Sequence, residues 1–137
     1  MKEKRKEKVT VKIYSAKKSI KYNTPTRLIT DFKTPISIVY TNNKELKSAW
    51  ISPSSKSKFL KFNWGYDGIL PYNLSISILS DFFDLDDFSI LLVSNEYKKI
   101  LDMFYFDYIV ENKSPSWEIT EDEITIYIND CMRQLGI

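Results

Sequence analysis

The stretch Phe62-Asn63-Trp64-Gly65-Tyr66-Asp67-Gly68-Ile69-Leu70-Pro71 divides the chain into two parts of different character. It contains two of the three glycines in the sequence, which indicates positive φ angles or a close backbone approach. Pro71 suits the first position of a helix, where its missing N–H would have no helical partner. The stretch therefore predicts a junction at which a β-rich part ends and a helical part begins.

Four segments before this junction have extended character. Residues 9–14 alternate between apolar and polar side chains, and Val9, Val11 and Ile13 form the apolar face of the predicted strand. Ile36–Tyr40 is rich in β-branched residues and ends at a turn-like Thr-Asn-Asn sequence. Ala49–Ile51 and Phe59–Phe62 indicate two further short strands. The first part is therefore predicted to be a small antiparallel sheet with lysines on its exposed face.

The part after the junction has helical spacing. Apolar residues follow Pro71 at helical intervals, Asp84 is expected to cap a next helix, and Tyr97–Val110 predicts a third. The Thr120–Glu123 segment has the capping-box pattern, in which the Thr hydroxyl accepts from the Glu amide and the Glu carboxylate reaches back. An apolar stripe follows it at Ile124, Tyr127, Ile128, Cys131 and Leu135.

These patterns predict one α+β domain, with an N-terminal antiparallel sheet of three to four strands followed by three to four helices packed on one face. Residues 1–8 are expected to form a flexible basic arm, and residues 9–137 the domain. Within the domain, residues 9–62 are the basic β-rich half and residues 63–137 the acidic helical half.

The composition excludes several classes of protein. A content of 43% hydrophobic and 15% aromatic residues is enough for a core, which excludes general disorder. No run approaches the roughly 18 apolar residues of a membrane span. Cys131, the single cysteine, cannot form an internal disulfide, and no apolar segment follows the basic N-terminus, so a cytoplasmic location is expected.

The same composition argues against most enzyme classes. There is no histidine for a catalytic dyad or a zinc site, and three glycines cannot build a glycine-rich phosphate loop. A Mg²⁺ site on the Asp81, Asp84, Asp86 and Asp87 group is a less favoured alternative, because hydrolytic sites usually collect acids from separate elements. No enzyme activity, cofactor or metal is therefore predicted.

The net charge of +2 conceals a strong asymmetry. The first 62 residues contain 16 basic and 4 acidic side chains, and the remaining 75 contain 4 basic and 14 acidic ones. The halves thus carry +12 and −10. Acids at helix starts explain part of the negative charge, because they complement the helix dipole. The remainder favours charged partners, including a second copy of the chain in a salt-sensitive homodimer.

The junction also resembles the signature of a small domain family of bacteria, plasmids and phages whose function is unknown. That signature is Phe-x-Trp-Gly-Tyr-x-Gly-x-Gly-Pro-x-x-Leu with a later Ile-Leu, and nine positions between Phe62 and Leu79 match it. A weaker similarity extends from Phe104 to Ile124, through Trp117, Thr120 and Glu123. Leu70 replaces the glycine before the proline. The resemblance implies an accessory protein of a mobile element and carries no activity with it.

Five residues are predicted to bind a partner protein. Trp64 and Tyr66 could present rigid aromatic area, and Asp84, Asp86 and Asp87 could contact a basic groove. The alternative for Trp64 is a core anchor, with the glycines only shaping the turn.

A second alternative is direct nucleic-acid binding by the basic, aromatic sheet face. The residues predicted for it are Lys12, Lys17, Lys18, Lys21, Arg27, Lys56, Lys58 and Lys61. The favoured hypothesis is a non-catalytic interaction protein of a phage or other mobile element. It would bind a protein or ribonucleoprotein of the host and inhibit a defence system, as an anti-CRISPR protein does, or another nucleic-acid-handling complex.

Overall fold

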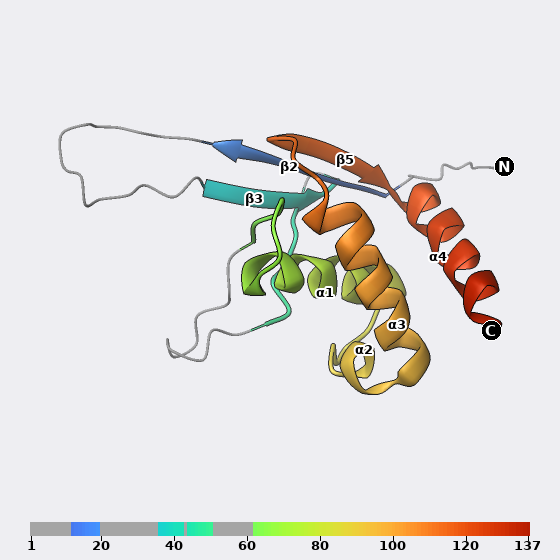
Figure 1. The fold of residues 1–137 in the computed structure, drawn as a ribbon. Helices are drawn as coiled ribbons and strands as arrows, with labels where there is room; N and C mark the ends of the chain where they lie inside the picture. Colours follow the sequence, from blue (N-terminus) through green and yellow to red (C-terminus); the bar gives the residue numbers. More distant parts are fainter. Residues whose placement is uncertain (1–11, 20–35, 43, 51–61) are drawn as a thin grey trace, which may run out of the picture.

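Figure 1 shows the computed structural model of the chain, which describes residues 12–19, 36–42, 44–50 and 62–137. The four antiparallel strands β2 (Ile13–Ser19), β3 (Ile36–Thr41), β4 (Lys44–Glu45) and β5 (Ser116–Thr120) lie in the order β4-β3-β2-β5. The helices are α1 (Ile69–Phe83), α2 (Ile90–Val93), α3 (Asn95–Phe104), the π-helical η1 (Tyr105–Val110) and α4 (Glu121–Leu135). The predicted fold class, an N-terminal antiparallel sheet followed by helices, is confirmed.

Strand β2 is central in the sheet and joins the two halves of the chain. It pairs with β3 on one side and with β5, from the acidic half, on the other. Ala16 lies opposite both Val39 of β3 and Trp117 of β5. The sequence did not predict β5, because only two apolar residues alternate in it. Its pairing means that the basic and acidic halves share one sheet.

The inward face of β2 differs from the predicted one. Tyr14 is fully buried and Ala16 is buried, whereas Ile13 is only half-buried. Strand side chains alternate between faces, so the inward set has the even numbers. Tyr14 can face inward because its hydroxyl reaches a carboxylate of α1, as described below. Val9 and Val11 lie outside the described residues.

The predicted strand at Ala49–Ile51 is wrong over its described part. Ala49 and Trp50 are not in a strand, and the Ala49 amide donates to the Ser77 hydroxyl of α1 over 2.9 Å. The chain therefore crosses α1 here. The backbone amide of Ala49 bonds to a helix side chain, where a strand residue would bond to the backbone of a neighbouring strand. Phe62 is buried outside any strand, and residues 59–61 and the predicted arm lie outside the described residues.

Helix α1 lies below the sheet in Figure 1 and is buried on all sides over much of its length. Residues 73–80 are all buried, and Ser75, Ser77 and Ser80 are among them. A helix that is surrounded in this way has no polar face, and small serine side chains let its neighbours approach closely. Three α-helices and η1 follow it.

The prediction that Asp84 caps a following helix is wrong, because Asp84 ends α1. It has a left-handed conformation, with φ 57°, and its amide donates to carbonyls of the last turn of α1. Aspartate enters this conformation more readily than most residues. Helix α2 begins only at Ile90.

The later helices follow the predicted pattern closely. The predicted Tyr97–Val110 helix is α3, which starts at Asn95, followed by the π-helical η1. Thr120 caps α4 through both bonds of the capping box. Cys131 is buried, as its place in the apolar stripe predicts. Among the described residues, no helix is long and apolar enough to cross a membrane.

Candidate functional site

The Trp64–Gly68 turn connects the sheet layer to the start of α1. Trp64 is only 1% exposed, and its indole N–H donates to the carbonyl of Ser114 over 2.7 Å. Its ring also packs edge-on against Trp117 of β5, with centroids 5.5 Å apart. The structure therefore places Trp64 in the core, where it cannot contact a partner directly, and leaves Tyr66 as the exposed aromatic residue of the turn.

The backbone of the turn is tied to the end of η1. The Gly65 amide donates to the carbonyl of Ile109 over 2.9 Å, and the Lys113 ammonium donates to the carbonyl of Gly65 over 2.8 Å. Gly65 has φ 93°, and an added Cβ would lie 3.1 Å from the Asn112 carbonyl oxygen. Only glycine accommodates both requirements without strain.

Replacing Gly65 with alanine is expected to lower the free energy of unfolding by about 1–2 kcal/mol, because alanine is strained at positive φ. Gly136→Ala is the matched control. That glycine also has positive φ, 74°, but an added Cβ there would meet no atom within 4 Å. Urea denaturation should show the larger loss for Gly65→Ala, and equal losses would contradict a steric contribution from Asn112.

Tyr105 of η1 holds the other side of the turn. Its hydroxyl donates to the Asp67 carboxylate over 2.6 Å and accepts from the Gly68 amide over 2.8 Å. Burial, and then the hydrogen bond to the Asp67 carboxylate, raise the pKa of Tyr105 to about 12. The turn is thus fixed from two directions, which keeps Tyr66 in place relative to η1.

This arrangement predicts a pH dependence of stability. The folded-state pKa of Tyr105 exceeds the unfolded value of about 10. The stability it contributes is therefore present below about pH 10 and is lost as the pH rises through about 12. Denaturant midpoints measured across this range should fall less in Tyr105→Phe than in the natural protein. The same slope in both proteins would refute the assignment, and Tyr66→Phe, on an exposed side chain, is the control.

Exposed apolar and acidic side chains gather around this fixed turn. Tyr66 is 42% exposed, Ile69 52% and Phe106 48%. The Phe106 ring lies 5.0 Å from the ring of Tyr105, whose hydroxyl contacts the turn. Asp67 and Glu111 are exposed beside them. We call Tyr66, Asp67, Ile69, Phe106 and Glu111 the turn surface. Of this set, the sequence predicted only Tyr66, and Phe106 is included because it is exposed next to Tyr105 in η1.

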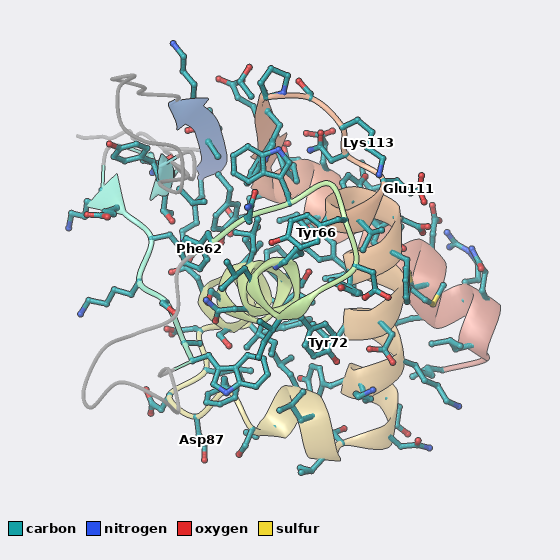
Figure 2. The ribbon with its side chains drawn as sticks, turned by 60° about the vertical axis from the view of Figure 1, so that its left-hand side comes forward. Phe62, Tyr66, Tyr72, Asp87, Glu111 and Lys113 are labelled. Atoms are coloured by element: carbon teal, nitrogen blue, oxygen red, sulfur yellow. The ribbon has the colours of Figure 1, made fainter. Side chains whose placement is uncertain are left out.

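The three predicted aspartates lie away from the turn surface. Tyr66 precedes α1 and Asp84 ends it, and a 15-residue helix is about 22 Å long. Figure 2 shows Tyr66 and Asp87 well apart, on different sides of α1. Asp87 accepts from the Ser89 amide over 2.9 Å, and this bond lowers the pKa of its carboxyl group. Asp84 and Asp86 line a groove at the end of α1. Tyr66 and the three predicted aspartates therefore do not form one binding surface.

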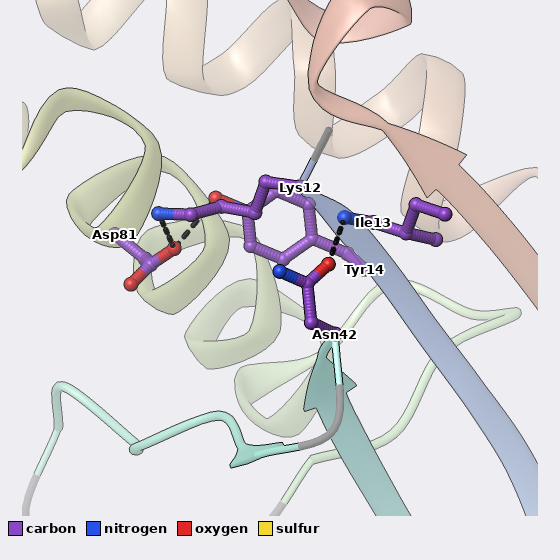
Figure 3. Close-up of polar contacts among 5 residues, drawn as sticks. All are labelled: Lys12, Ile13, Tyr14, Asn42 and Asp81. Atoms are coloured by element: carbon purple, nitrogen blue, oxygen red, sulfur yellow. Dashed lines mark hydrogen bonds and ion pairs between the residues drawn. The ribbon is translucent and has the colours of Figure 1, made fainter. Parts of the chain in front are cut away.

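Two of the lysines predicted to bind nucleic acid have described surroundings. The ammonium group of Lys12 lies 3.1 Å from the Asp81 carboxylate, and the Tyr14 hydroxyl donates to the same oxygen over 2.6 Å (Figure 3). Burial and the Asp81 contact raise the pKa of Tyr14. Lys12 therefore connects β2 to α1. Lys17 is exposed on the face of β2 opposite the core.

The other residues of that set are not brought together by what the structure describes. Lys18 is in β2, opposite Ser37 of β3. The remaining five, Lys21, Arg27, Lys56, Lys58 and Lys61, lie outside the described residues.

The described part of the chain contains no group of three or more acidic or cysteine side chains placed to hold a metal ion. Its raised tyrosine pKa values have structural causes, namely burial and hydrogen bonds to carboxylates. Comparisons with protein-family models, curated proteins and solved structures find no match for this chain.

Proposed function

We propose that this protein is a non-catalytic interaction protein that binds a basic surface on a host protein or ribonucleoprotein. The observation that carries the proposal is the charge of the acidic half of the chain. Residues 63–137 contain 4 basic and 14 acidic side chains, a balance of −10, although the whole chain carries +2. An acidic surface is attracted to the basic grooves with which other proteins hold nucleic acids.

The turn surface is the proposed contact. Its three exposed apolar side chains supply contact area, and its two carboxylates outnumber the Lys113 ammonium at the turn, which leaves a negative charge for a basic partner. The turn is held by hydrogen bonds from Tyr105 and Lys113, so its ordering on binding would cost little. By occupying a basic groove, the protein would exclude nucleic acid from it.

The resemblance of Phe62–Leu79 to a family of mobile-element proteins suggests the biological setting. In that setting the partner is a host defence complex of CRISPR type or another nucleic-acid-handling complex, and the site of action is the cytoplasm. This context rests on the resemblance alone.

Affinity capture from the native host tests the proposal. The natural protein is expected to retain a basic, nucleic-acid-binding protein. The variant Tyr66→Ala/Phe106→Ala is expected to retain at least about tenfold less of this partner, since central aromatic residues dominate interfaces. Ile126→Ala is the control, because Ile126 is 63% exposed on α4, outside the turn surface. Equal retention by the double variant and the natural protein would reject the turn surface as the contact.

Direct nucleic-acid binding is the second candidate function. Ala16 and Val39 face the core, so Ser15, Lys17 and Tyr40 point to the opposite face of the sheet. Tyr40 is 39% exposed there, and an exposed aromatic ring beside a lysine on a sheet face is a typical stacking platform. Fluorescence polarisation with single- and double-stranded oligonucleotides separates the candidates. Binding that weakens steeply with salt and with Tyr40→Ala would support this second function.

A further inference from the structure

A groove lined by both apolar and charged residues lies at the C-terminal end of α1, away from the turn surface. Its volume is about 890 Å³. Residues 44–49 form one wall, and the last turns of α1 with the segment as far as Phe88 form the other. The Lys12–Asp81 ion pair of Figure 3 lies at its border. The groove thus combines residues from both halves of the chain.

Two hydroxyl groups in the lining are buried without a partner. Ser80 is only 9% exposed, and its Oγ has no hydrogen-bond partner among the described residues. Thr41, which also lines the groove, is half-buried, but its Oγ1 is likewise buried and has no hydrogen-bond partner among the described residues. By contrast, the hydroxyls of Ser48 and Ser77, which also line it, are hydrogen bonded. Buried polar groups are rarely left unpaired, which points to a ligand that supplies the missing bond.

The charge at the α1 end of the groove selects the ligand. Asp84 and Asp86 are exposed there, whereas the Asp81 carboxylate already binds Lys12 and Tyr14. The helix C-terminus adds negative potential, and the last turn of α1 contains no basic residue to balance it. Leu85 and Phe88 provide apolar surface beside these carboxylates. Lys44 and Lys47, on the other wall, suit the carbonyl groups of a peptide.

We propose that the groove binds a basic segment of a partner protein, with an arginine or lysine side chain at the end of α1. Its cationic group lies between Asp84 and Asp86, and its aliphatic stem packs on Phe88. The Ser80 hydroxyl, after rotation, accepts one of its N–H groups. The inference rests on the proposed function in one respect, that the partner is basic, but it uses a different surface.

Calorimetric titration with the peptide acetyl-Gly-Arg-Leu-Arg-Gly-amide tests the proposal. Asp84→Asn/Asp86→Asn is expected to weaken binding at least about tenfold, because the charge-assisted hydrogen bonds to two carboxylates are lost. Asparagine tolerates the left-handed conformation at position 84, so this variant should fold. Glu118→Gln/Asp122→Asn removes two charges elsewhere and should change affinity less than about twofold. The peptide with citrulline in place of arginine should not bind.

Ser80→Ala separates binding from folding. Removing a buried hydroxyl that lacks a partner should leave the thermal midpoint unchanged or raise it, while peptide affinity falls about threefold. A lowered midpoint would show that the hydroxyl is bonded within the protein, which overturns the argument. So would absent binding by the natural protein, equal binding of the citrulline peptide, or equal affinity of the two double variants.

Failure of this proposal can be distinguished from failure of the proposed function. If Asp84→Asn/Asp86→Asn loses no peptide affinity but the natural protein still captures its partner through Tyr66 and Phe106, only the groove assignment fails. If no basic partner is captured while the peptide still binds in the groove, the proposed function fails instead.

Discussion

Replacing Trp64 with alanine is expected to lower the free energy of unfolding by about 3–5 kcal/mol, a large share of the stability of a small domain. The indole is buried in the core, packs on Trp117 of β5 and donates to the Ser114 carbonyl. Alanine would leave a cavity and an unpaired carbonyl group. Chemical denaturation followed by circular dichroism measures the loss.

Tyr66→Ala is the matched control for Trp64→Ala. It lies two residues away in the same turn but is 42% exposed, so its loss should stay below about 1 kcal/mol. A similar loss for both variants would contradict the assignment of Trp64 to the core. The control also establishes that a binding defect of Tyr66→Ala does not come from unfolding.

Separating the two halves of the chain is expected to abolish cooperative folding. A polypeptide of residues 63–137 contains the sequences of α1 and the later helices but lacks β2, to which β5 is hydrogen bonded in the full chain. It also loses Lys12 and Tyr14, the partners of Asp81, and exposes Ile119, which is buried in the intact protein. Thermal unfolding followed by near-ultraviolet circular dichroism should show no sigmoidal transition.

Adding residues 1–62 to this polypeptide should restore part of the transition, because the halves carry +12 and −10. The restored signal should weaken as salt is added. If residues 63–137 alone unfold with the midpoint of the full chain, the halves are independent, and the shared sheet contributes little to stability.

The sequence predicts elements whose signals are local. The Thr120 capping box and the stripe that contains Ile124, Ile128 and Cys131 fall within a few turns of one helix, and α4 has both features. Ile36–Tyr40 likewise forms β3, because its β-branched composition and following turn suffice to mark a strand.

Elements that depend on distant partners were not predicted. β5 is a strand because β2 lies beside it, although about one hundred residues separate Tyr14 from Ile119. The inward orientation of Tyr14 depends on Asp81 of α1, and no local alternation can reveal that contact. Asp84 resembles a helix N-cap in sequence, yet its position after a buried helix makes it a C-cap.

The candidate site residues also divide into those that the sequence predicted and those that only the structure identified. The residues predicted to bind a partner are all exposed except Trp64, which is in the core; the set is Trp64, Tyr66, Asp84, Asp86 and Asp87. The sequence could not show that Tyr66 and the aspartates lie at opposite ends of α1. Ser80 could not be identified from the sequence, because it belongs to no motif. It becomes a candidate because its hydroxyl is buried without a hydrogen-bond partner among the described residues.

Displacement of nucleic acid from the captured partner tests the central claim most directly. The purified partner is first bound to a fluorescent oligonucleotide, and the natural protein or Tyr66→Ala/Phe106→Ala is then titrated in while polarisation is recorded. The natural protein is expected to release the oligonucleotide, and the double variant to require at least about tenfold more protein. An oligonucleotide that stays on the partner, or that transfers to this protein, would contradict the claim that the acidic half of the chain competes for a basic groove.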